Sequence, residues 1–194
     1  MPGYLRPKVE LEQYVTDSHI VAELVWLSYM RREFVEGRVL DLGCGTGRFS
    51  IAAALLGASQ VVCLDIDKDA ISQVWSMVRN DPYLSSVIDV VVSDALLPCL
   101  RSVFHVVFQN PPFGIQSRRG IDIEFLKSAC KLGKIVYSIH KAETYEYVIN
   151  KCRELGDVSV LGFDILNIPP MYKHHFKRLH KVRVVLVRVE SRLI

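Results

Sequence analysis

The chain has 194 residues, with 24 Lys and Arg against 21 Asp and Glu, and a formal net charge of +3. Because half of the residues are hydrophobic and 23% are charged, the composition excludes a disordered chain and fits one domain over 1–194 with a sizeable core. The longest apolar run is too short and too interrupted to span a bilayer and the first residues hold no apolar signal segment, so we expect a cytoplasmic protein with no membrane partner.

Strands and helices are predicted to alternate along most of the chain. A helical stretch over 16–37 precedes predicted strands at 38–43, 59–67, 88–95, 103–109 and 134–140, with helices at 48–58, 68–81, 123–133 and 142–156 between and after them. Two β-branched runs, 158–168 and 182–190, follow with no helix between them. This order predicts an α/β fold: a doubly wound, mostly parallel seven-stranded sheet with an antiparallel C-terminal edge hairpin. The apolar strand at 88–95 reads equally well as an edge that pairs with another chain or as a buried interior strand.

A glycine loop, "DLGCGTG" at 41–47, follows the first predicted strand and opens the first helix of the alternating pattern. Gly43, Gly45 and Gly47 let the backbone approach a ligand closely, at the place where open α/β sheets bind ligands. The spacing G-x-G-x-G differs from the G-x-G-x-x-G loop of dinucleotide enzymes. Asp41 beside the loop repels a pyrophosphate but suits an ammonium or sulfonium group, which disfavours NAD.

Two more acids end the next two predicted strands. Asp65 is placed to accept hydrogen bonds from both ribose hydroxyls of an adenosine, and Asp94 could accept one from the adenine amine. Their neighbours Ile66 and Ala95 are expected to line the same pocket. A single aspartate at a strand end often only begins a turn or caps a helix. Three acids at successive strand ends beside a glycine loop indicate an adenosine with a cationic amino-acid tail, which is S-adenosylmethionine.

The motif "NPPFG" at 110–114 follows the predicted strand 103–109. Its two prolines lack backbone donors and stiffen the turn. The side-chain oxygen of Asn110 and the carbonyl of Pro111 could accept hydrogen bonds from an amine, and Phe113 offers a face on which a base can stack. We therefore assign the catalytic role to the four residues Asn110, Pro111, Pro112 and Phe113, with Asn110 also touching the cofactor.

These motifs, in this order, resemble those of the class I S-adenosylmethionine-dependent methyltransferases over about 37–140. The N-P-P-F form is similar to the signature of enzymes that methylate adenine N6, whereas N-P-P-Y occurs in enzymes that methylate a glutamine amide of release factors. "LEQYVT" (11–16), "GIDIEFL" (120–126), "VYSIHK" (136–141) and "PPMYKHHFK" (169–177) resemble segments of the small RNA N6-adenine methyltransferases of the methyltransferase-like protein five group.

The second resemblance implies ribosomal RNA as the substrate and a small zinc-binding activator protein as a partner. It also implies that Gln13, Tyr14 and Thr16, within an N-terminal lid and helix over 1–36, fold over the cofactor. Val15 departs from the family, which commonly has proline there. Two alternatives stay open: a glutamine-amide methyltransferase acting on a protein such as a release factor, and an RNA-binding module without activity.

Basic and aromatic residues gather between the last two strands, at 169–183. Cations can follow a phosphate backbone and aromatic rings can stack on unpaired bases, although a solvated loop reads the same way. Arg118, Arg119, His140 and Lys141 lie near the presumed site, where His140 is either a proton acceptor or a structural residue. The residues assigned to the substrate are Phe113, Arg118, Arg119, His140, Lys141, Tyr172, Lys173, Lys177 and Arg178.

The five cysteines stand singly, without a C-x-x-C pair, and at least three fall in predicted strands or helices. This pattern indicates reduced thiols in the core of a cytosolic protein. A zinc site from His174, His175 and a distant cysteine matches no structural zinc spacing, so no metal is expected.

Overall fold

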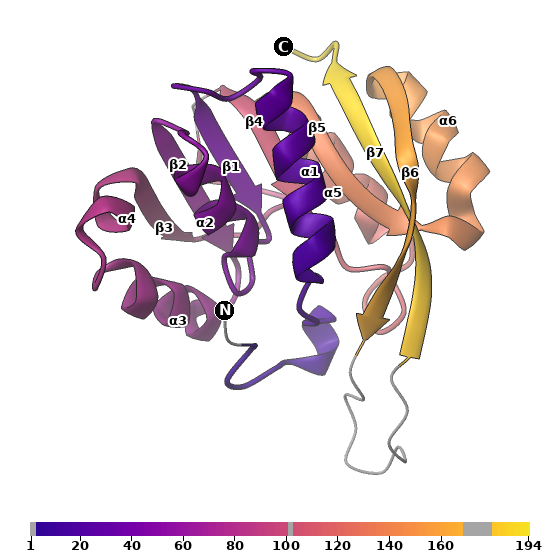
Figure 1. Cartoon of the computed structure of the whole chain (residues 1–194). Helices are drawn as coiled ribbons and strands as arrows, with labels where there is room; N and C mark the ends of the chain where they lie inside the picture. Colours follow the sequence, from indigo (N-terminus) through magenta and orange to yellow (C-terminus); the bar gives the residue numbers. More distant parts are fainter. Residues whose placement is uncertain (1–2, 101–102, 169–179) are drawn as a thin grey trace.

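The computed structural model describes residues 3–100, 103–168 and 180–194, with the backbone alone at His180. Its centre is a seven-stranded sheet in the order β3-β2-β1-β4-β5-β7-β6 (Figure 1). The strands are β1 Arg38–Leu42, β2 Gln60–Asp65, β3 Ile88–Val92, β4 Phe104–Gln109, β5 Gly133–Lys141, β6 Gly156–Ile168 and β7 His180–Ser191.

Strand β1 occupies an inner position of the sheet and pairs in parallel with β2 and β4. The pairs β2 with β3 and β4 with β5 are also parallel, whereas β7 runs antiparallel to both β5 and β6. The predicted doubly wound, mostly parallel sheet with an antiparallel pair at its C-terminal edge is therefore confirmed. The strand predicted at 88–95, whose position was left open, forms the opposite edge as β3.

Helices cover both faces of this sheet (Figure 1). Buried side chains of α1 Ser18–Met30, α2 Arg48–Leu55 and α3 Lys68–Val78 pack on one face, and those of α5 Ile121–Leu132 and α6 Tyr145–Leu155 pack on the other. In α3 the buried positions Ile71, Val74 and Val78 recur every three or four residues, so they share one side of the helix. Each such side chain stabilises the fold by about 1.5–3 kcal/mol relative to an exposed one.

The connection after α3 differs from the prediction, which extended that helix to 81. The helix ends at Val78, and a short helix, α4 Pro82–Val87, precedes β3. Asp81 caps α4, because its carboxylate accepts hydrogen bonds from the backbone N–H groups of Tyr83 and Leu84. Proline fits the first position of a helix, where its missing donor is not needed, so Pro82 begins a helix here.

The N-terminal segment before α1 contains the short 3-10 helix η1 Val9–Leu11, and a second one, η2 Ala142–Thr144, precedes α6. Figure 1 shows the N-terminal segment at the end of the sheet where the parallel strands finish. In the parts of the chain that the structure describes, no helix is long and apolar enough to cross a membrane.

Candidate functional site

A cavity of about 240 Å³ lies at the carboxyl ends of the parallel strands. Eleven of the residues predicted for the site line it: Gln13, Tyr14, Thr16, Asp41, Gly43, Asp65, Ile66, Asp94, Ala95, Asn110 and Pro112. The loops after β1, β2, β3 and β4 and the N-terminal segment therefore converge on one space. This is the position where open α/β sheets hold ligands.

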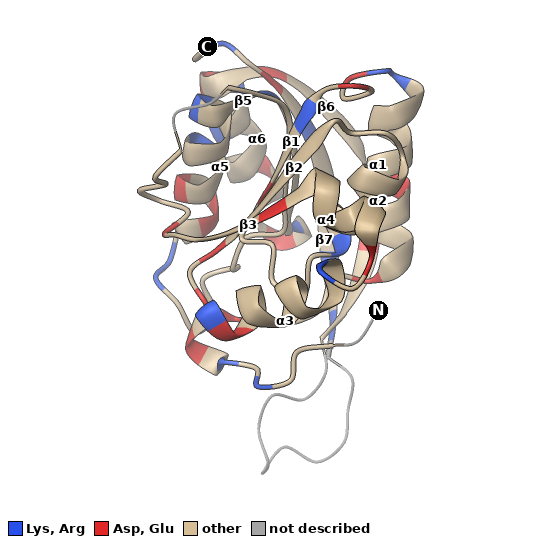
Figure 2. Cartoon of the chain, turned by 90° about the vertical axis from the view of Figure 1, so that its left-hand side faces the viewer, with Lys and Arg blue, Asp and Glu red and all other residues tan. Residues whose placement is uncertain are grey.

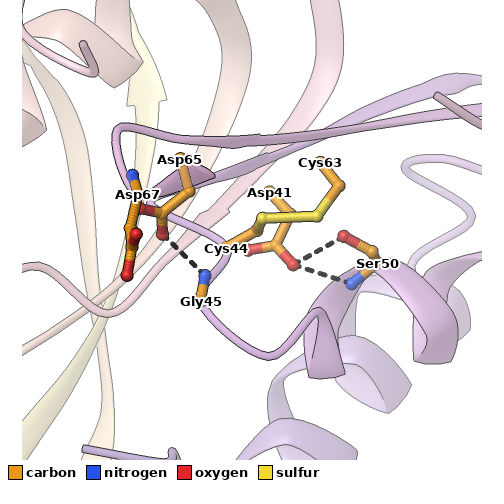
Figure 3. Close-up of a disulfide and its surroundings, with 7 residues drawn as sticks. All are labelled: Asp41, Cys44, Gly45, Ser50, Cys63, Asp65 and Asp67. Carbon is orange, nitrogen blue, oxygen red and sulfur yellow. Dashed lines mark hydrogen bonds between the residues drawn. A yellow bond between two sulfur atoms is a disulfide. The ribbon is translucent and has the colours of Figure 1, made fainter. Parts of the chain in front are cut away.

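The glycine loop after β1 is tied to the end of β2 (Figure 3). The N–H of Gly45 donates a hydrogen bond of 2.8 Å to Asp65 Oδ2. Gly45 has a φ of 51°, which favours glycine, and a Cβ on it would meet the hydroxyl of Tyr4 at 1.9 Å. Tyr4 thus lies directly against the loop, so the loop tolerates no side chain at this position.

Asp41 is buried, and its Oδ2 accepts hydrogen bonds from the backbone N–H and the hydroxyl of Ser50 at 2.9 and 2.7 Å (Figure 3). Burial raises the pKa of Asp41 to about 7, although both bonds from Ser50 oppose the shift. A positive charge brought into the cavity would favour the ionised form. Asp41 is therefore a carboxylate whose charge depends on its ligand.

Asp65 and Asp67 form a second acidic group at the end of β2. Asp65 Oδ1 accepts from the N–H of Asp67 at 2.8 Å, and burial raises the pKa of Asp65. Asp67 caps α3 through the N–H of Asp69 and also accepts from the Nε2 of Gln13 at 2.7 Å. The side chain of Gln13, predicted to touch the cofactor, is thus engaged with Asp67 while its residue lines the cavity.

The expectation that all cysteines are reduced is wrong for two of them. Cys44 of the glycine loop and Cys63 of β2 form a disulfide, with a Cα to Cα distance of 5.5 Å (Figure 3). The parallel pairing of β1 with β2 puts Cys63 beside Asp41, three residues before Cys44 in the chain. Spacing in the sequence could not reveal this, because the two cysteines meet only through the strand register. Among the described residues Cys99, Cys130 and Cys152 are free.

The N-terminal segment lines the cavity and also contacts the proline turn. Thr16 Oγ1 accepts a hydrogen bond of 3.0 Å from the amide nitrogen of Asn110. The ring of Tyr14 packs against Phe113, with centroids 5.5 Å apart. Of the three residues predicted to fold over the cofactor, Tyr14 and Thr16 thus contact the proline turn.

In the proline turn, Asn110 Oδ1 is buried and has no hydrogen-bond partner among the residues that the structure describes. Phe113 is buried and is not among the residues that line the cavity; the ammonium group of Lys141 lies 6.0 Å from its ring centroid. An oxygen that has lost its water without gaining a donor is unfavourable unless a ligand supplies one. Asn110 Oδ1 is therefore an acceptor available to a donor in the cavity.

Of the remaining residues assigned to the substrate, some lie on the surface and others fall outside the described residues. Arg118 is exposed and forms an ion pair with Glu124, and Arg119 is exposed beside it. Tyr172, Lys173, Lys177 and Arg178 lie outside the described residues, as does most of the predicted basic segment. At the base of that segment the guanidinium of Arg183 lies 4.8 Å from the ring centroid of Phe163.

His140 is fully buried, so the prediction that it contacts the substrate is not supported by its position. One ring nitrogen lies 2.8 Å from the hydroxyl of Ser138, and the other lies 3.0 Å from a carboxylate oxygen of Asp122. Both nitrogens are engaged within the fold. This favours the structural alternative, in which His140 joins β5 to α5.

Two residues of the site were missed by reasoning from the sequence. Glu12 accepts hydrogen bonds from the proline turn, and Tyr4 lines the cavity against Gly45. Burial raises the pKa of Tyr4 far above its ordinary value, so its hydroxyl stays neutral. Glu12 was visible as an acid inside "LEQYVT", whereas nothing around Tyr4 in the sequence indicates a site.

The residues around the cavity fit S-adenosylmethionine. The carboxylates of Asp41 and Asp65 provide the acidic surroundings that suit a cationic amino-acid tail and ribose hydroxyls. Tyr14 Oη, in the lining of the cavity, is a buried polar atom without a hydrogen-bond partner among the described residues. A polar group of the bound cofactor would satisfy this atom, which leaves Asn110 Oδ1 for the substrate.

Comparison with known proteins gives consistent matches over nearly the whole chain. The family model described as methyltransferase small domain matches residues 21–160. The chain is 34% identical to a Drosophila melanogaster protein named rRNA N(6)-adenosine-methyltransferase Mettl5, over 97% of this chain and 90% of the relative. It is 33% identical to the Methanocaldococcus jannaschii protein MJ0284, over 95% and 87%. The crystal structure of PH1948 from Pyrococcus horikoshii, described as a candidate RNA methyltransferase, is similar with a TM-score of 0.87 at 33% identity, over 98% and 92% of the chains.

Proposed function

Because this chain belongs to the methyltransferase small domain family and is an S-adenosylmethionine-dependent methyltransferase, we propose that it methylates the N6 amine of an adenine in structured RNA. Small-subunit ribosomal RNA is the substrate we favour. Relatives from Drosophila melanogaster and Danio rerio, 34% and 33% identical, are named rRNA N(6)-adenosine-methyltransferases. Activity on ribosomal RNA would agree with the expected cytoplasmic location.

The observation that carries this proposal is the buried, unpartnered Oδ1 of Asn110 at the edge of the cavity. The amine of adenine is a poor nucleophile, because its lone pair is delocalised into the ring. Asn110 Oδ1 and the carbonyl of Pro111 form an amine-accepting corner. They would accept hydrogen bonds from the two N–H groups of the amine and turn its lone pair out of conjugation with the ring. Thr16 holds the amide of Asn110 in the required orientation, since its hydroxyl accepts from the Nδ2.

The rest of the site has to orient the base. When bound, S-adenosylmethionine supplies a methyl group on a positively charged sulfur, so the amine does not have to be deprotonated before it attacks. Tyr14 lines the cavity and offers aromatic surface for the base. Its ring packs on Phe113, which the stiff proline turn fixes relative to Asn110. The amine loses its proton after the transfer, and no strong base is needed. The buried His140, with both nitrogens engaged, has no role as one in this scheme.

We also propose that the zinc-binding activator implied by the family docks at the β3 edge. Figure 2 views the molecule from this side. Asp89 is the one charged residue of β3 and α4, and Val92 and Trp75 beside it are 55% and 44% exposed. An apolar edge strand is prone to pairing with other chains, and a partner strand would cover it. Replacing Val92 with Glu should abolish copurification with the coexpressed activator, whereas Val160→Glu at the far edge should not.

The function is tested by transfer of labelled methyl from S-adenosylmethionine to ribosomal subunits, naked ribosomal RNA, DNA and release factor, followed by nucleoside analysis. Wild type should produce N6-methyladenosine in RNA alone. Asn110→Ala should lose at least 100-fold of this activity, because the contribution of Asn110 arises in the transition state. Its affinity for S-adenosylmethionine should fall far less, by the loss of one contact. Asn150→Ala, the same change at an exposed position of α6, is the matched control.

The outcomes separate the alternatives. Label in the release factor would establish the glutamine-amide reaction instead. If the protein binds the cofactor but transfers methyl to no acceptor even with the activator present, the result would support the alternative of an RNA-binding module without activity. Activity of Asn110→Ala equal to that of Asn150→Ala would remove the amine-accepting corner from the mechanism.

A further inference from the structure

Glu12 joins the N-terminal segment to the proline turn. Its carboxylate is buried, with 6% of the residue exposed. Oε2 accepts a hydrogen bond of 2.7 Å from the N–H of Phe113. Oε1 accepts from the N–H groups of Gln116 and Ser117 at 2.8 and 2.9 Å, and from the Ser117 hydroxyl at 2.7 Å. One side chain therefore receives four donors from a turn about a hundred residues away.

The backbone at Glu12 is unusual for a residue with a side chain. Its φ of 50° and ψ of 42° are left-handed, a conformation that disfavours non-glycine residues by about 1–2 kcal/mol. This conformation ends η1 and turns the chain toward Gln13 and Tyr14, which line the cavity. The four hydrogen bonds to the carboxylate can offset this cost, and glycine could not supply them.

The protonation state of Glu12 suits this arrangement. Burial raises the pKa of its carboxyl, but the hydrogen bonds from Ser117, Gln116 and Phe113 lower it by more, so the pKa lies below its ordinary value. An ionised carboxylate only accepts hydrogen bonds, as the three N–H groups and the hydroxyl require. A glutamine of the same shape would bring an NH₂ group against N–H donors.

The residues next to Glu12 contact the two halves of the site. Gln13 donates to Asp67, beside Asp65 at the cofactor end, and Thr16 accepts from Asn110 at the proline turn. Tyr14 between them packs on Phe113. The segment 12–16 therefore spans the cavity. Most of the hydrogen bonds between this segment and the turn are made by Glu12.

We propose that Glu12 is a positioning residue, whose carboxylate holds the backbone of 113–117. The amine-accepting corner of Asn110 and Pro111 is then in place only when the N-terminal segment is docked on the turn. This inference rests on the proposed function, because the corner is assigned to the adenine. Glu12 would act through Phe113 and the turn, without contacting the base or the methyl group.

The test is Glu12→Gln, with Glu23→Gln at an exposed position of α1 as the matched control. In Glu12→Gln, kcat on RNA should fall about 10- to 100-fold, as expected for losing hydrogen bonds to a charged acceptor. The Kd for S-adenosylmethionine should change less than threefold. Amide hydrogen exchange at Phe113, Gln116 and Ser117 should be at least tenfold faster, while exchange in β1 and β4 stays as in wild type.

Unchanged exchange at these three amides would overturn the proposal whatever the activity. A fall in kcat accompanied by an equal loss of cofactor affinity, or by faster exchange throughout the sheet, would also overturn it, because either result would indicate a general structural role. If Glu12→Gln does not fold, Ser117→Ala removes one of the four donors and should give a smaller change of the same kind. If the wild type methylates no RNA, the proposed function fails, and the exchange measurement still decides whether Glu12 holds the turn.

Discussion

The hydroxyl of Thr16 accepts a hydrogen bond of 3.0 Å from the amide nitrogen of Asn110, across 94 residues of sequence. This contact decides which atom of the amide faces a ligand. With the nitrogen bound to Thr16, the oxygen is left buried and free to accept. An amide turned by 180° would offer a donor to the adenine amine, which needs acceptors.

Thr16→Val should therefore reduce methyl transfer by about 3- to 10-fold, the effect expected for one neutral hydrogen bond. The shape of the side chain is nearly kept, so the unfolding temperature should change little. Thr16→Ser retains the hydroxyl and should keep most of the activity. Single-turnover rates at saturating cofactor and RNA measure the effect, and equal rates for the Val and Ser variants would contradict it.

Cofactor binding should depend on pH through Asp41. Burial raises the pKa of Asp41 from 3.8 to about 7, so the native protein without ligand holds this proton more tightly than the unfolded chain does. The stability that this group contributes is fully present below about pH 4 and is lost as the pH rises through 7. A cationic ligand needs the ionised form, so its affinity should rise up to about pH 7 and level off above it.

Calorimetric titration between pH 5.5 and 8.5 measures this dependence. For each unit that the pH falls below 7, the Kd should rise by up to about tenfold, as one linked proton requires. Burial also raises the pKa of Asp65, which therefore contributes in the same direction, so Asp41→Asn is needed to isolate Asp41. Asp41→Asn should bind S-adenosylmethionine weakly, and its Kd should depend less steeply on pH. Between pH 5 and 8 its free energy of unfolding without ligand should fall less than that of wild type. A slope equal to that of wild type would exclude Asp41 as the linked group.

The sheet was predictable from the sequence because the periodicity of the apolar residues identifies the strands and helices, and their order along the chain predicts how the strands pair. The β-branched runs alternate with helical patterns up to Leu155, and the missing helix between β6 and β7 predicts their antiparallel pairing. The short helix α4 was missed because Pro82 reads equally as the end of one helix or the start of another. The choice depends on Asp81, whose side chain caps the next turn.

The site was predictable where function lies in a contiguous motif, as in the glycine loop and the proline turn. It was not predictable where side chains meet across the fold. Glu12 meets residue 113 because the N-terminal segment packs on the proline turn, and Cys44 meets Cys63 because the register of β1 and β2 brings them together. His140 shows the opposite case, since its place near the motif suggested chemistry and its burial shows a structural contact.

The disulfide between Cys44 and Cys63 should stabilise the protein through the unfolded state. It closes a segment with a sequence separation of 19, for which loss of chain entropy gives about 3 kcal/mol. Cys63→Ala should therefore lower the free energy of unfolding in urea by about this amount, and reductant should have no further effect on that variant. Cys152→Ala, at a buried free thiol, should lose only about 1 kcal/mol and stay sensitive to reductant. Equal stability of the wild type with and without reductant would show that the disulfide contributes nothing.

Lys141 should bind RNA next to the proline turn. Its ammonium group lies 6.0 Å from the ring centroid of Phe113, so RNA docked at the proline turn would bring a phosphate within reach of this cation. Lys141→Ala should weaken RNA binding several-fold at low salt and reduce the slope of log K against log salt by about one, as the loss of one phosphate contact predicts. Lys131→Ala removes the same charge from an exposed position of α5 and should leave the slope unchanged. Equal effects of the two changes would mean that Lys141 contributes only general charge, and a loss of cofactor affinity in Lys141→Ala would place the lysine in the cavity instead.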